Sequence, residues 1–198
     1  MQTDYVFLHG GAQGSWVWDE TIAALKLQSG GNFGRALALD IPGCGRKRER
    51  PTADIEVPAI VAELIADIET AGLQDVVLVG HSQAGTILPL LVAARPSLFR
   101  RLIYISCLAP VGEQTALNWR ADMPDDGSAP LHSGTPSSRE RFSAMFCNDL
   151  TAIEREQFLD KLGSDQWPAS SYRLSGWHYE HLTAVPTTYV LCLRDFSL

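Results

Sequence analysis

The sequence has 198 residues, of which 45% are hydrophobic and 20% charged, and its formal net charge is −7. This composition excludes a disordered chain, because it supplies enough apolar side chains for a core, and the negative charge disfavours nucleic acid and anionic membranes as partners. A domain of this length buries roughly 70% of the surface that its unfolded chain exposes, so we expect one domain with an insertion.

Two features of the sequence predict a cytoplasmic protein. Met1–Asp4 lead directly into the apolar run Tyr5–Leu8, which leaves no room for a signal peptide, and no stretch approaches the roughly 18 apolar residues of a membrane span. The cysteines lack a C-x-x-C pair, so free thiols in a reducing compartment are the favoured interpretation, although their even number leaves disulfides open. They are Cys44, Cys107, Cys147 and Cys192.

Short β-rich runs alternate with longer amphipathic segments, a pattern typical of a parallel sheet with helices on both faces. In chain order, the predicted elements are strand Tyr5–Leu8, helix Trp18–Leu27, strand Arg35–Leu39, helix Ile55–Ala71, strand Val76–Val79, helix Thr86–Ala94, and strands Leu102–Ser106 and Thr188–Leu193. The second strand is followed by a basic cluster, Arg46, Lys47, Arg48 and Arg50. A nuclear address or an anion patch is one interpretation of this cluster, and a solvated loop is the favoured one.

The first predicted strand ends in His9-Gly10-Gly11-Ala12. Small residues let backbone N–H groups approach a ligand closely, as the stabilisation of an oxyanion requires. A merely flexible turn is the alternative. We favour the first interpretation because of the motif that follows the third strand.

That motif is Gly80-His81-Ser82-Gln83-Ala84-Gly85, which resembles G-x-S-x-G except that Ala84 occupies the second glycine position and the glycine follows one residue later. It lies between the strand Val76–Val79 and an apolar helix, the order found in a nucleophile elbow, where a sharp turn exposes the serine hydroxyl. With both flanking elements present, a coincidental turn is disfavoured. The N–H of Gln83 and that of Gly11 or Ala12 are the expected oxyanion donors.

The strand pattern stops after Pro110, and we predict an insertion at residues 111–186 within a core of residues 1–110 and 187–198. Two helical pieces are expected in the insertion, near Arg139–Phe146 and Thr151–Leu162. Its apolar side chains suit a lid over a pocket, with Trp119 and His178, along with Ala12 of the core, as candidate pocket-lining residues. The alternative is that most of them form a small core of the insertion itself. The apolar set is Trp119, Met123, Met145, Phe146, Phe158, Trp167 and Trp177.

Four segments together resemble a known family: Leu8–Gly11, Gly14–Trp18, Gly80–Gly85 and Tyr189–Asp195. They are similar to the α/β-hydrolase branch that contains plant methyl esterases, hydroxynitrile lyases and bacterial esterases. The resemblance implies an α/β-hydrolase fold with a mostly parallel sheet, helices on both faces and a helical lid. It also implies that Asp195 is the acid of a catalytic triad, which would orient an imidazole.

Other residues compete for the acid and base positions. Asp40 is expected to organise its own turn, and Glu113 lies several residues beyond the end of its strand. The superfamily carries its triad in the order serine, acid, histidine, so we expect the natural chain to continue past Leu198 through a further strand and helix that supply the histidine. His178 and His181 are the alternative bases, and no further Cys/His cluster completes a metal site around them.

The sequence therefore predicts a hydrolase that acts on an ester, a lactone or a similar small acyl substrate through an acyl-enzyme at Ser82, without a cofactor. A lyase of the hydroxynitrile lyase type is the nearest alternative. A non-catalytic ligand-binding module is the alternative from another class. A small molecule is the expected partner, and the oligomeric state stays open, with a homo-oligomer among the choices.

Overall fold

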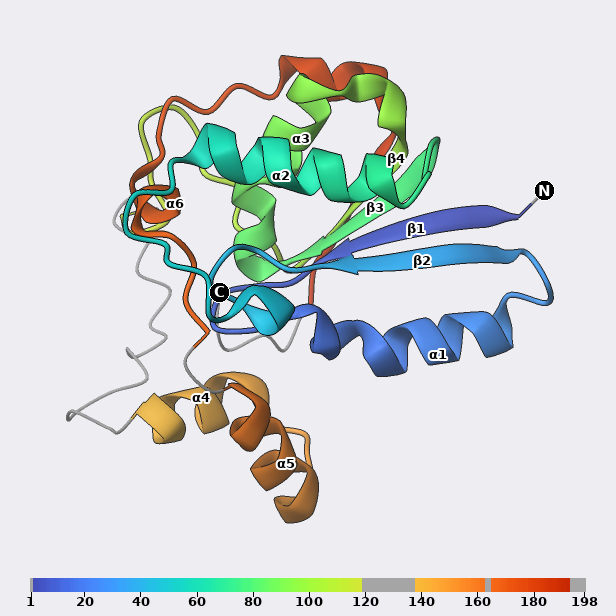
Figure 1. Ribbon diagram of the computed structural model, residues 1–198. Helices are drawn as coiled ribbons and strands as arrows, with labels where there is room; N and C mark the ends of the chain where they lie inside the picture. Colours follow the sequence, from blue (N-terminus) through green and yellow to red (C-terminus); the bar gives the residue numbers. More distant parts are fainter. Residues whose placement is uncertain (1, 119–137, 163–164, 193–198) are drawn as a thin grey trace.

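A parallel sheet forms the centre of the molecule (Figure 1). The computed structural model describes residues 2–118, 138–162 and 165–192. In these ranges five strands lie in the spatial order β2-β1-β3-β4-β5. The strands are β1 (Thr3–Leu8), β2 (Phe33–Leu39), β3 (Val76–His81), β4 (Phe99–Ile105) and β5 (Thr187–Val190). The α-helices are α1 (Asp19–Gln28), α2 (Val57–Thr70), α3 (Leu88–Ala94), α4 (Ser138–Phe146), α5 (Ala152–Leu162) and α6 (Ala169–Arg173), and the 3₁₀ helices are η1 (Ser15–Trp18), η2 (Gly45–Lys47), η3 (Ser82–Thr86), η4 (Pro96–Leu98) and η5 (Glu180–Ala184).

Helices cover both faces of the sheet, with α1 on one side and α2 and α3 on the other (Figure 1). Alternate side chains of β3 therefore enter two separate cores: Val77 and Val79 pack in the cluster that contains Trp18, and Leu78 packs in the cluster that contains Leu64. This double burial explains the uninterrupted apolar run of β3, because a strand covered on both sides has no solvent face. The predicted parallel sheet with helices on both faces is confirmed.

Helix α2 shows how the periodicity of the sequence determines the packing. Ile60, Leu64, Ile65 and Ile68 recur at helical spacing and are all buried against the sheet. Pro58 lies in the first turn, where a missing N–H leaves no hydrogen bond unmade. The predicted helix is present, shortened at both ends.

The helix predicted from Thr86 begins later than expected. Ser82–Thr86 forms η3, and α3 begins at Leu88 with Pro89 in its first turn. The difference arises because the chain turns sharply at Ser82. The residues directly after this turn adopt the tighter 3₁₀ geometry, and the regular α-helix begins only after them.

Strand β5 lies at one edge of the sheet, in parallel pairing with β4 from Leu102↔Thr187 to Ile105↔Val190. Because all the strands are parallel, the carboxyl end of β5 lies at the same edge of the sheet as the end of β3. Residues that follow β5 therefore start near the serine motif.

The insertion contributes helices but no regular strand among its described residues. Figure 1 places α4 and α5 beyond the carboxyl ends of the strands. Cys147, Leu159 and Leu162 form a small separate core there, with Phe146 and Phe158 packed against it. Part of the apolar set of the insertion thus forms its own core, while Trp167 is buried in the main core.

The basic cluster after β2 is balanced by acidic partners. Arg46 pairs with Asp40, Lys47 with Glu63 and Asp67, Arg48 with Asp165, and Arg50 with Glu63. These ion pairs connect the loop to α2 and to the insertion. The cluster is therefore a structural loop rather than an anion-binding patch.

The structure leaves the cysteines without disulfide bonds. All four cysteines are free, with Cys44, Cys107 and Cys147 buried and Cys192 exposed. No helix within the described ranges is long and apolar enough to span a bilayer. Stability in these ranges therefore depends on packing and hydrogen bonding, without disulfide cross-links.

Candidate functional site

The turn after β3 holds Ser82 in a strained conformation. Its φ is +52°, a value that non-glycine residues adopt rarely and at a cost in energy. The strand ends one residue earlier, at His81, and η3 begins at Ser82 itself. This strand–turn–helix geometry presents the serine side chain at the carboxyl edge of the sheet, as a nucleophile elbow requires.

The two glycines of the motif are required by close contacts. A Cβ at Gly80 would lie 2.7 Å from Cδ1 of Leu88, and a Cβ at Gly85 would overlap the carbonyl oxygen of Leu108. The N–H of Leu108 in turn donates a hydrogen bond of 2.9 Å to the carbonyl of Ser82. Gly80 and Gly85 thus allow β3, η3 and the residues after β4 to lie in close contact.

The glycine turn after β1 lies directly beside the elbow. A Cβ at Gly10 would lie 3.0 Å from the Cβ of Ser82, and Ala12 has a φ of +58°. The N–H of Gln83 belongs to the first turn of η3, where backbone donors have no carbonyl partner within the helix. Backbone donors of both turns are therefore brought to one place.

A cavity of about 570 Å³ lies above Ser82. From the core it is lined by Gly11, Ala12, Ser82, Gln83 and Leu108, and from the insertion by Phe142, Met145, Phe146, Asp165, Gln166 and Tyr172. Its size falls in the range of small-molecule pockets. Residues 142–172 therefore supply most of its apolar wall.

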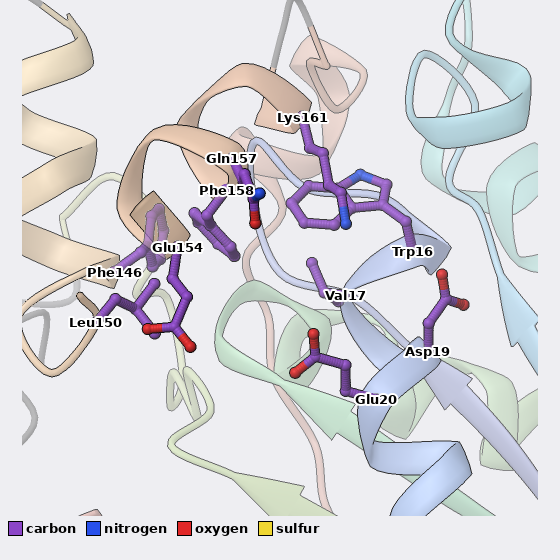
Figure 2. A pocket seen from close by; sticks show the side chains of 10 residues that line it. All are labelled: Trp16, Val17, Asp19, Glu20, Phe146, Leu150, Glu154, Gln157, Phe158 and Lys161. Carbon is purple, nitrogen blue, oxygen red and sulfur yellow. The ribbon is translucent and has the colours of Figure 1, made fainter. Parts of the chain in front are cut away.

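A second hollow, of about 360 Å³, lies where α5 meets η1 and α1 (Figure 2). Phe158 packs edge-on to Trp16 at 5.3 Å between ring centroids, and the ammonium of Lys161 lies 5.5 Å from the centroid of the Trp16 ring. The carboxylate of Glu154 accepts hydrogen bonds from the N–H and hydroxyl of Thr151, which cap α5. The contacts of Phe158 and Lys161 with Trp16 hold α5 against η1.

His9 supports the glycine turn as a neutral ring. Burial lowers its pKa below the ordinary value, although the hydrogen bond to the Gly10 carbonyl partly opposes this. Nε2 accepts a hydrogen bond of 3.2 Å from the N–H of Ile41, so the proton resides on Nδ1, which donates to the Gly10 carbonyl at 2.8 Å. Since both ring nitrogens are engaged, His9 is a structural residue.

Asp40 organises the loop after β2, as its turn position predicts. Its buried carboxylate accepts hydrogen bonds from the N–H of Ser15 at 2.6 Å, from the Ser15 hydroxyl at 3.0 Å and from Nε of Arg46 at 2.7 Å. Burial alone would raise the pKa of Asp40, but these donors lower it below its ordinary value. With its acceptors occupied, Asp40 is not available to orient a catalytic imidazole.

We expect Asp40→Asn to lower the free energy of unfolding at pH 7 by about 2 kcal/mol, the scale of hydrogen bonds to a charged group. A carboxyl group with a lowered folded-state pKa stabilises the protein above its unfolded pKa of about 3.9, and this contribution is lost as the pH falls through the folded pKa. The effect of the variant should therefore shrink on acidification.

Urea unfolding from pH 7 down to well below the unfolded pKa of about 3.9 measures this change. Asp75→Asn is the matched control, because Asp75 is exposed and its φ of +52° also suits asparagine. A loss for Asp40→Asn that equals the control, or that does not vary with pH, would contradict the assignment.

The remaining candidates lie away from the cavity or outside the described residues. Glu113 is exposed and accepts a hydrogen bond of 3.0 Å from the Ser175 hydroxyl. His178 is exposed, and neither it nor His181 lines the cavity above Ser82, so the expectation that His178 lines the pocket is wrong. Asp195 and Trp119 lie outside the described residues, as does Met123. Ala12 lines the cavity.

Cys107, near the elbow, is protonated. Burial raises its pKa to about 12, and its thiol donates to the carbonyl of Gly80 at 3.2 Å. A thiol held in this form is inert as a nucleophile. Among described residues, no group of three or more His, Cys, Asp or Glu side chains is arranged to hold a metal ion.

Comparison with known families agrees with this geometry. Residues 5–198 match the alpha/beta hydrolase family. The chain belongs to this family.

A carbendazim-hydrolysing esterase from Nocardioides sp. (strain SG-4G) is 27% identical over 107 residues, which cover 54% of the chain and 43% of the esterase. A putative chloroplastic methylesterase 11 from Arabidopsis thaliana is 26% identical over 115 residues, 58% of the chain and 28% of that protein. The chain thus spans less than half the length of these curated relatives.

Solved structures share the fold. Polyneuridine aldehyde esterase superposes with a TM-score of 0.72 at 20% identity, over 98% of this chain and 82% of its own. The pyrethroid hydrolase PytH gives 0.71 at 16% identity, over 98% of this chain and 79% of its own. At such identities the likeness shows the α/β-hydrolase architecture. The sequence resemblance to esterases of this branch is confirmed.

Proposed function

We propose that Ser82 is the nucleophile of a hydrolase that cleaves an ester, a lactone or a similar small acyl compound without a cofactor. The observation that carries the proposal is the strained φ of +52° at Ser82, on a turn beside the glycine pair and beneath a cavity of about 570 Å³. Strained backbone conformations cluster at active sites, and Ser82, unlike Asp75 and Ser106, also lines this cavity. Esterases among the relatives support the reaction class.

The reaction proceeds in two steps. The Ser82 hydroxyl oxygen attacks the carbonyl carbon of the substrate, and the N–H groups of Gly11 and Gln83 stabilise the oxygen that becomes negatively charged. The alcohol leaves with a proton, and water then hydrolyses the acyl-serine ester to release the acid. Both donors are backbone groups, which need no reorganisation as the charge develops.

The proton of Ser82 is taken by a histidine that Asp195 orients. Asp195 follows β5, whose carboxyl end lies at the same edge of the sheet as Ser82. In the chain order of this superfamily, the histidine comes after the acid, so we place it beyond Leu198 in the natural protein. His178 and His181 are disfavoured because they do not line the cavity.

The cavity favours a substrate with an apolar group. Phe142, Met145 and Phe146 of α4 form a hydrophobic wall opposite Gly11 and Gln83. Burial of an apolar group against such a wall contributes about 25 cal/mol for each Å² removed from water. The expected substrates are therefore small esters with an aryl or alkyl group.

A fluorophosphonate probe tests the proposal. It should label the natural full-length protein once, on the peptide that contains Ser82, as read by mass spectrometry. Rapid acid quenching during turnover of a p-nitrophenyl ester should also trap an acyl group on that peptide. Labelling without a trapped acyl group would favour the lyase alternative, and the absence of both would favour a ligand-binding module.

A further inference from the structure

The carbonyl of Gly10, in the glycine turn, accepts two hydrogen bonds from side chains. Nδ1 of His9 lies 2.8 Å from this oxygen, and Nε1 of Trp167 lies 3.2 Å from it. Trp167 belongs to the insertion, 157 residues away in sequence, and is only 1% exposed. The insertion therefore reaches the turn that carries the proposed oxyanion donor.

Peptide geometry connects this carbonyl to that donor. The Gly10 oxygen and the Gly11 N–H belong to one planar peptide unit, and no cis peptide bond occurs among the described residues. In a trans unit the two groups point in opposite directions. Holding the oxygen between His9 and Trp167 therefore directs the N–H of Gly11 away from both rings, and Gly11 lines the cavity with Ser82.

This peptide unit needs external support. It joins two glycines, and without Cβ atoms their backbone dihedrals are the least restricted in the chain. A Cβ at Gly10 would lie 3.0 Å from that of Ser82 and would crowd the serine, whereas one at Gly11 would meet only the flexible end of the Gln83 side chain, with Oε1 at 2.5 Å. The orientation must therefore come from hydrogen bonds.

Trp167 is itself firmly held. The N–H of Gln166 donates to the Gly43 carbonyl at 3.1 Å, and the carboxylate of Asp165 accepts from the N–H of Gly45 at 3.2 Å and pairs with Arg48. The Trp167 ring packs edge-on against His9, with 5.9 Å between centroids and an interplanar angle of 88°. The indole is thus a fixed donor.

We propose that Trp167 is a positioning residue of the oxyanion hole, whose indole N–H orients the Gly10–Gly11 peptide so that the Gly11 N–H faces the developing oxyanion. This inference rests on the proposed function of Ser82. It makes the folded insertion part of the catalytic machinery as well as a wall of the pocket. The contribution is electrostatic preorganisation, so it acts on the transition state more than on substrate binding.

The test compares Trp167→Phe with Trp177→Phe in the natural full-length protein. Trp177 is also a buried tryptophan of the insertion, 7% exposed, and its Nε1 donates to the Gln114 carbonyl at 2.8 Å. Each variant removes one indole–carbonyl hydrogen bond, but only one of these bonds is at the glycine turn. Removal of a whole oxyanion donor costs about 10² to 10³ in kcat, so loss of one of its two supports should cost about tenfold.

Hydrolysis of p-nitrophenyl acetate and inhibition by a trifluoromethyl ketone, which forms an oxyanion on the serine, provide the kinetic measurements. For Trp167→Phe we expect kcat and inhibitor affinity to fall about tenfold with KM within about twofold, whereas Trp177→Phe should change each by less than about threefold. Equal losses in the two variants would overturn the inference.

The N–H residual dipolar coupling of Gly11, measured by NMR, tests the orientation without relying on catalysis. It should change in Trp167→Phe but not in Trp177→Phe, and an unchanged coupling would overturn the inference even if no ester were hydrolysed. If the wild-type protein hydrolyses no ester, the proposed function fails while this measurement still decides whether Trp167 holds the turn. If Trp167→Phe does not fold, benzothienylalanine at position 167 retains the ring shape without the N–H.

Discussion

Ser82→Ala should reduce kcat for p-nitrophenyl acetate by a factor on the order of 10⁶ in the natural protein, the loss seen when the nucleophile of a triad is removed. The reason is chemical: no other group at the elbow can form the acyl ester, since the neighbouring Cys107 thiol is held protonated by burial. KM should change little, because the cavity walls remain. Initial rates over a range of ester concentrations measure both constants.

Ser106→Ala is the matched control for this prediction. Ser106 follows the adjacent strand β4, is buried, and also has a positive φ, +41°. Its hydroxyl has no hydrogen-bond partner among the residues that the structure describes, so its removal should cost little. Comparable losses in the two variants would show that a general disturbance of the sheet edge, rather than a missing nucleophile, causes the effect. Circular dichroism confirms that each variant folds.

The core elements could be predicted from the sequence because they depend on local patterns. The run Val76–Val79 and the helical spacing from Ile60 to Ile68 each indicate their element without reference to the rest of the chain. The elbow is equally local, since its glycine requirements arise within a few residues of Ser82 and from the neighbouring Leu108. The predicted and the observed elements differ only in the residues at which they begin and end.

The connections between distant segments could not be predicted in this way. Nothing near Trp167 in sequence indicates that its indole meets the carbonyl of Gly10, and nothing near Arg48 indicates its pairing with Asp165. Such pairs depend on how the insertion folds over the core, and its composition suits either a lid or a separate core. The sequence identifies Asp40 as a turn residue. It does not indicate that the carboxylate of Asp40 is buried or that Arg46 is its partner.

The acid of the triad is the second catalytic position with a large expected effect. Asp195→Asn should lower kcat by about 10⁴, because asparagine holds the imidazole in the tautomer that cannot accept the serine proton. The prediction rests on the sequence after β5, whose carboxyl end lies at the edge of the sheet where β3 delivers Ser82. The fold should be retained, because the change preserves the shape of the side chain.

Glu113→Gln is the control. Glu113 is the alternative acid and lies after β4, and its variant removes one negative charge, as Asp195→Asn does. Glu113 is exposed and hydrogen-bonded to Ser175, so its variant should keep kcat within about twofold of the wild type. The pH profile reports the base that the acid orients. A protonated imidazole cannot accept the serine proton, so activity of the wild type should fall as the pH drops through the pKa of the histidine base, near 6.5 when unperturbed. A large loss in Glu113→Gln together with an intact Asp195→Asn would transfer the acid role to the segment after β4.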